Sequence, residues 1–160
     1  MAGLTLVEFL FAVSITAIAG LGVAGMFPAA LRSVVTGGQT TKATVLAQEM
    51  ADMIRADTFA KAVDYNGTDT TSSFTCTSSD TVCNNKLKWK NDLVAATAQE
   101  TGKGLPNGKG TVSVACVNPD GTSKTCDHAN DDLRRVTVTV MWDREGSRSV
   151  SLVTYVARNE

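Results

Sequence analysis

The sequence predicts an α+β fold in which one long N-terminal helix packs on a small antiparallel sheet of three or four strands. Two patterns predict it. An apolar run at positions 4–31 continues into an amphipathic segment at positions 32–59, and the last third of the chain alternates between apolar and polar residues. All four cysteines fall in positions 60–160. This remaining part is long enough for one small core, so we expect a single disulfide-containing globular domain.

The apolar run has the length of a membrane span. As a helix, positions 4–31 would extend for about 42 Å, against a hydrocarbon core about 30 Å thick. Pro28 lies inside this run; it lacks an amide hydrogen and clashes with the preceding turn. We therefore expect a transmembrane helix that is kinked, or has one melted turn, at Pro28.

Glu8 is the one charged residue before Arg32. A carboxylate at the bilayer centre costs about 2.5–3.5 kcal/mol, and less near the end of a helix. An acid inside a membrane span is by default functional and needs a positive partner. The alternative is an ordinary signal anchor in which Glu8 lies at the level of the lipid headgroups.

Helical spacing continues after the apolar run. Leu46, Met50 and Ile54 recur on one face, while Glu49 and Asp52 lie on the other. The segment is thus expected to continue the first helix and to pack its apolar face against the sheet.

The middle of the chain is rich in Thr, Ser, Asp and Asn, and positions 57–85 are expected to form a loop. Within it, residues 66–68 have the form of a glycosylation sequon, but we expect a turn there. A short helix is expected from about Asp92 to Thr101, with Asn91 as its N-cap and Gly102 just past its end.

Three strands are expected after this helix, separated by turn residues at positions 118–121 and 143–147. Short connections predict an antiparallel meander with one face on the amphipathic helix. The inward-facing residues would be Val112, Val114 and Cys116, then Val136, Val138, Val140 and Trp142, and finally Val150, Leu152, Thr154 and Val156.

The cysteine spacing favours two local disulfides, Cys76–Cys83 and Cys116–Cys126. Disulfides form in oxidising compartments, so the domain is expected outside the cytoplasm. Metal binding is the rival interpretation, but the gaps are longer than those of zinc knuckles and His128 is the only histidine. We expect no metal site.

No catalytic constellation is visible, so we expect neither an enzyme nor a cofactor. Asp127, Asp131 and Asp132 carry oxygens that Ca²⁺ would accept, but EF-hand spacing is missing and a solvated acidic loop is favoured. A net charge of −1 with mixed signs gives no basic stripe, and no nucleic-acid partner is expected.

The first residues resemble the processing motif of type IV prepilins, in which a glycine precedes Leu-Thr-Leu-Val-Glu and a long apolar helix. The resemblance implies that prepilin peptidase cuts between Gly3 and Leu4 and methylates the new N-terminus on Leu4. It also implies a role in assembly for Thr5 and for Glu8, which would pair with the N-terminal ammonium of a neighbouring subunit. Positions 1–3 would then be a leader remnant, positions 4–31 a helix of the filament core, and positions 60–160 the globular pilin domain.

Three later segments, at positions 46–56, 105–110 and 134–142, are similar to minor pilins known as type IV pilus modification proteins. The resemblance implies a subunit that helps to initiate or modify a surface pilus. Its partners would be major and minor pilins, prepilin peptidase, the inner-membrane assembly platform and, before assembly, the lipid bilayer. It would lie in the bacterial inner membrane with a periplasmic domain before joining the filament.

Two other functions are consistent with the residues. A type II secretion pseudopilin would share the N-terminal chemistry, and a membrane-anchored extracytoplasmic binding module would share the anchor. Basic residues usually precede the glycine of a prepilin, whereas Met1 and Ala2 are uncharged, so a longer natural leader is expected. By themselves, Arg32 and Lys42 would place the domain in the cytoplasm; the cysteines favour the opposite side.

Overall fold

The computed structural model describes residues 5–94, 104–127, 131–143 and 146–158. The chain divides into two compact units, Met1–Gly38 and Gln39–Glu160, and helix α1 contributes to both. The elements in chain order are α1 (Leu6–Ala56), the 3₁₀ helix η1 (Ala60–Tyr65), β1 (Thr68–Asp69), α2 (Thr81–Val94), β2 (Lys109–Cys116), β3 (Leu133–Asp143) and β4 (Ser147–Ala157).

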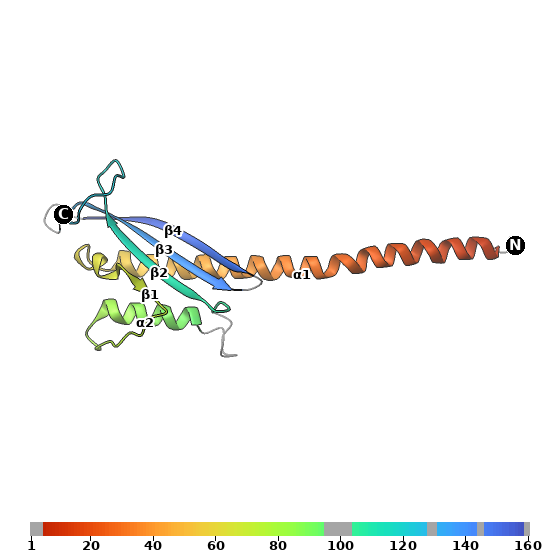
Figure 1. The fold of residues 1–160 in the computed structure, drawn as a ribbon, viewed down its shortest axis with the longest axis horizontal. Helices are drawn as coiled ribbons and strands as arrows, with labels where there is room; N and C mark the ends of the chain where they lie inside the picture. Colours follow the sequence, from red (N-terminus) through yellow and green to blue (C-terminus); the bar gives the residue numbers. More distant parts are fainter. Residues whose placement is uncertain (1–4, 95–103, 128–130, 144–145, 159–160) are drawn as a thin grey trace. The chain divides into compact units, whose positions relative to one another are not determined.

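The sheet is antiparallel with strand order β1-β2-β3-β4, and β2, β3 and β4 form the expected meander (Figure 1). Along β3, buried residues alternate with half-buried ones, as period-two patterning requires. Its buried valines pair across the sheet with Val112 and Val114 of β2 and with Leu152 and Thr154 of β4. The predicted α+β fold is therefore confirmed.

The core of the second unit lies between this sheet and the C-terminal part of α1. Figure 1 shows β2, β3 and β4 crossing that part of the helix. The helix contributes a stripe at three- and four-residue spacing, which is the pattern of one buried face. The buried residues of the stripe are Ala43, Leu46, Ala47, Met50, Ala51 and Ile54.

The predicted helix at positions 92–101 was wrong, because α2 begins at Thr81 and Asn91 lies inside it. Asp80 caps the helix by accepting a hydrogen bond from the Cys83 amide at 3.0 Å. Only three residues of α2 are buried (Val82, Trp89 and Leu93), so its polar composition resembled a loop. Gly102 and positions 95–101 lie outside the described residues. The predicted loop at positions 57–85 likewise contains η1, β1 and the first turn of α2, although the turn expected at residues 66–68 is present.

Trp89 fixes α2 against the other elements of the core. Its side chain is fully buried, and its indole Nε1 donates a hydrogen bond of 2.8 Å to the carbonyl oxygen of Leu46 in α1. The same ring covers Gly110 of β2 so closely that a Cβ at that position would lie 2.2 Å from it. Trp89 therefore links α1, α2 and β2 through one side chain.

Tyr65, in η1, links the segment just after α1 to α2. The buried phenol donates a hydrogen bond of 2.5 Å to Asp57, just after α1, and accepts one of 2.8 Å from the Asn85 side chain in α2. Burial raises the pKa of Tyr65 above its ordinary value, and the adjacent Asp57 carboxylate raises it further.

We expect Gly110→Ala to lower the free energy of unfolding by about 1–3 kcal/mol, because the new methyl group must displace the Trp89 ring from a packed core. Gly37→Ala is the matched control, since nothing lies within 4 Å of a Cβ there. Thermal unfolding of both variants in the same detergent measures the difference. Equal stability of Gly110→Ala and the parent protein would contradict this packing.

The Tyr65 phenol should make stability fall at high pH. Because its folded-state pKa is raised, its contribution is fully present below the unfolded value of about 10 and decreases above it, by at most about 1.4 kcal/mol per pH unit. Tyr65→Phe should therefore lose stability less steeply than the parent protein between pH 9 and 11. Denaturant unfolding at each pH measures the slopes, with Tyr155→Phe as the control. Parallel slopes for Tyr65→Phe and the parent would refute the assignment.

Candidate functional site: the capped apolar helix

The N-terminus of α1 is closed by a reciprocal contact between Thr5 and Glu8. The backbone amide and the hydroxyl of Thr5 each donate a hydrogen bond of 3.0 Å to Glu8 Oε2, and the Glu8 amide approaches Thr5 Oγ1 at 3.4 Å. This is the geometry of a capping box, which satisfies amides that a helix start leaves without partners. The sequence carries the signal for it, a Thr followed three residues later by Glu before an apolar run. Gly3 and Leu4, the predicted cleavage site, lie outside the described residues.

Within the described part of the first unit, the surface of α1 is apolar and uncovered. All residues from Thr5 to Val35 are exposed, and their large side chains include Phe9, Phe11, Ile18 and Phe27. Helix α1 is long and apolar enough to cross a membrane. A signal sequence near the N-terminus can have the same length and composition. Such a surface requires lipid or other apolar helices around it.

Several polar side chains of this apolar segment have hydrogen-bond partners within the helix. Ser14 Oγ donates to the carbonyl oxygen of Leu10 and Thr16 Oγ1 to that of Ala12, both at 2.8 Å. Hydroxyls that bond back to their own helix add little cost in a hydrocarbon environment. Glu8 also has hydrogen-bond partners within the first turn, but these do not neutralise its charge.

Pro28 lies inside α1, and the helix continues through it to Ala56. The melted turn that we considered is therefore absent, and the kink remains a prediction. Gly37 and Gly38 also lie inside the helix, at the boundary between the two compact units.

The globular unit contains the two disulfides that the spacing favoured. Cys76–Cys83 joins the segment before α2 to the first turn of that helix, with the Cα atoms 5.5 Å apart. Cys116–Cys126 joins the end of β2 to the following loop, with the Cα atoms 5.2 Å apart. Asp131 lies close to the second pair, but sulfurs bonded to each other are not thiolate ligands, so this group is not a metal site in the disulfide form.

The expectation of a fully solvated acidic loop was wrong for Asp131, which is completely buried. Its carboxylate accepts a hydrogen bond of 2.9 Å from the Asp127 amide and pairs with Lys124 Nζ at 3.2 Å. The lysine supplies the positive charge that a buried carboxylate requires. Asp127 and Asp132 are exposed, and His128 lies outside the described residues.

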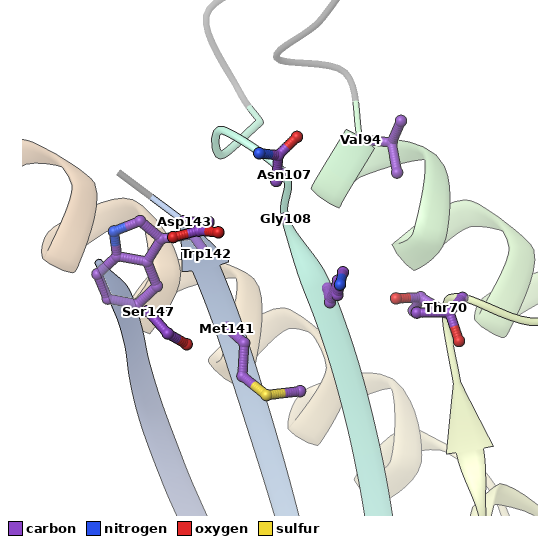
Figure 2. A pocket seen from close by; sticks show the side chains of 10 residues that line it. Thr70, Val94, Asn107, Gly108, Met141, Trp142, Asp143 and Ser147 are labelled. Carbon is purple, nitrogen blue, oxygen red and sulfur yellow. The ribbon is translucent and has the colours of Figure 1, made fainter. Parts of the chain in front are cut away.

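A cavity of about 450 Å³ lies where β2 and β3 approach the end of α2 (Figure 2). Among its described lining residues, Lys109 and Asp143 are charged, and there is no histidine or cysteine. The Thr70 hydroxyl is already engaged, accepting a hydrogen bond of 2.8 Å from the Gly110 amide. The described lining residues are Thr70, Thr71, Val94, Asn107, Gly108, Lys109, Met141, Trp142, Asp143 and Ser147.

Comparison with protein-family models, curated proteins and solved structures found no match for this chain.

Proposed function

We propose that this protein is a minor type IV pilin, a non-enzymatic subunit that helps to initiate or modify a surface pilus. The observation that carries the proposal is one helix with two environments. Its N-terminal part exposes an apolar surface behind a Thr5–Glu8 cap, and its C-terminal part forms the core of a disulfide-bonded domain. An anchor that must leave lipid for a filament needs such a surface, because lipid and packed apolar helices can both cover it.

In this proposal the subunit lies first in the membrane and then in the filament. It first lies in the bacterial inner membrane with its domain in the periplasm, where both disulfides can form. Prepilin peptidase then cuts between Gly3 and Leu4, and the assembly platform transfers the subunit to a filament of major and minor pilins. In the filament, Glu8 pairs with a neighbour's N-terminal ammonium, since two charges in a low-dielectric bundle are tolerated only together.

Mass spectrometry of the protein from its native cells tests this proposal. The expected N-terminus is N-methyl-Leu4, and the expected cysteine state is two disulfides, Cys76–Cys83 and Cys116–Cys126. Protein recovered from sheared surface filaments with an unmodified Met1 would refute the processing, and four free thiols would refute the periplasmic location. Absence from filaments together with a processed N-terminus would instead favour a type II secretion pseudopilin.

We expect Glu8→Gln to lower incorporation into filaments by about tenfold or more, because the neighbouring ammonium loses its charged partner. The glutamine carbonyl can still accept both hydrogen bonds from Thr5, so the cap and membrane insertion should be retained. The readout is the ratio of filament-borne to membrane-borne protein in quantitative immunoblots.

Thr5→Ser is the matched control, since it keeps the hydroxyl of the cap and should leave incorporation unchanged. Wild-type incorporation of Glu8→Gln would show that the charge of Glu8 has no role in assembly. Loss of the variant from the membrane fraction would show that Glu8 is needed already for insertion.

A further inference from the structure

Strand β4 forms one of the two edges of the sheet. β4 is the last strand in the sheet order, so within the described residues no strand pairs with its outer side. Along an antiparallel strand, every second residue directs its N–H and C=O groups away from the neighbouring strand. β4 therefore presents a row of donors and acceptors that another extended segment can pair with.

Most features that normally protect such an edge are missing from positions 149–157 of β4. The opposite edge of the sheet, β1, has 2 residues, whereas β4 has 11. Its register with β3 runs without a bulge from Leu133↔Ala157 to Asp143↔Ser147. Positions 149–157 contain no charge, no proline and no glycine. Soluble proteins usually keep free edges short, charged, bulged or covered.

The side chains of β4 also suit an added strand. Val153 and Tyr155 lie on the outer face of the sheet and are each 51 % exposed. Val150 and Leu152 lie on the opposite face and are half-buried against the core. An added strand would place its own alternating side chains beside both pairs and cover apolar surface on each face.

The charged residues at the two ends of β4 indicate which kind of segment can pair with this edge. Arg148 is exposed at one end of β4, and Arg158 follows the other end, with its guanidinium carbon 5.3 Å from the centre of the Phe59 ring. Two copies paired antiparallel about Val153 would bring Arg148 of each copy opposite Arg158 of the other. Parallel pairing in register would bring the two Arg148 side chains together. Like charges directly opposite one another destabilise a strand pair, so a second copy fits poorly.

We propose that the edge of β4 binds an extended segment of a different polypeptide, one that is uncharged in its middle and carries a carboxylate at each end. The backbone of β4 supplies the hydrogen bonds, Val153 and Tyr155 supply the apolar contact, and Arg148 and Arg158 pair with the terminal carboxylates. This inference does not depend on the proposed pilin function.

A synthetic peptide tests the edge on the full-length chain in detergent micelles. The probe is a fluorescent eleven-residue peptide, Asp-Thr-Val-Thr-Val-Thr-Val-Thr-Val-Thr-Asp, with blocked ends, because Arg148 and Arg158 span 11 positions. Fluorescence anisotropy should show saturable binding, and hydrogen exchange should show new protection of β4 amides. The same peptide N-methylated at every interior residue should not bind, because neither of its edges keeps amide donors. A version with lysine at both ends should bind at least about fivefold more weakly, since each end loses a favourable charge pair.

Protein variants separate the two contributions. Val153→Ser/Tyr155→Ser should weaken binding by about fivefold, and Thr137→Ser, on β3 opposite Val153, is the control that should not. Arg148→Glu should reduce or reverse the preference for the acidic peptide over the lysine version. Unchanged thermal unfolding of each variant shows that its fold is intact.

Several results would overturn the proposal. Lack of saturable binding at millimolar peptide, or equal binding of the N-methylated peptide, would exclude strand addition. Equal affinity for acidic and lysine-ended peptides would refute the charge of the occupant. Self-association in sedimentation experiments that Val153→Ser/Tyr155→Ser abolishes would show that the occupant is a second copy.

Discussion

The packing of Trp89 between α1 and Gly110 is the contact on which the globular unit depends. A three-stranded meander with one covered face needs a helix on that face, and α1 provides it. Trp89 adds the third layer, because its ring lies on the one β2 residue without a side chain while its indole nitrogen bonds to Leu46. A larger residue at position 110 would separate α2 from the sheet. The small domain thus obtains one continuous core from three elements that are far apart in sequence.

At the N-terminal end of β3, the buried side chain is a charged one, Arg134, rather than an apolar one. Arg134 is fully buried, its guanidinium lies 4.0 Å from the centre of the Phe59 ring, and it donates to the carbonyl oxygens of Phe59 and Ala60. Burial lowers the pKa of Arg134 from its ordinary value. The arginine therefore supplies partners for carbonyl groups where the chain leaves α1 and enters η1. A few residues before Arg134, Asp131 is neutralised by Lys124, which lies in the loop that Cys116–Cys126 closes. Removing one member of such a pair leaves an uncompensated buried charge, which makes this end sensitive to single substitutions.

Patterns in the sequence predicted those parts of the fold that are determined by residues close together in the chain. The strands follow from period-two alternation, and the long helix follows from an apolar run that continues into a stripe of Leu46, Met50 and Ile54. Helix α2 was misplaced because its buried positions are few and lie in a polar background, and its tertiary contacts through Trp89 determine it more than its composition does. The burial of Asp131 was missed for a similar reason, since it depends on pairing with Lys124, which sequence spacing alone does not reveal.

At the candidate site, the assembly role of Thr5 and Glu8 stays a prediction. Thr5 and Glu8 were interpreted through an assembly partner, whereas the structure shows that they first satisfy each other. The cap gives the Glu8 carboxylate two hydrogen bonds, which offset part of the cost of placing a carboxylate in an apolar environment. These bonds do not neutralise its charge, so a cationic partner is still favoured. In the proposed filament, a neighbour's ammonium would have to compete with, or join, the two hydrogen bonds from Thr5. The cap would thus lower the gain from any single pairing of Glu8, and incorporation would also depend on packing of the exposed apolar surface of α1.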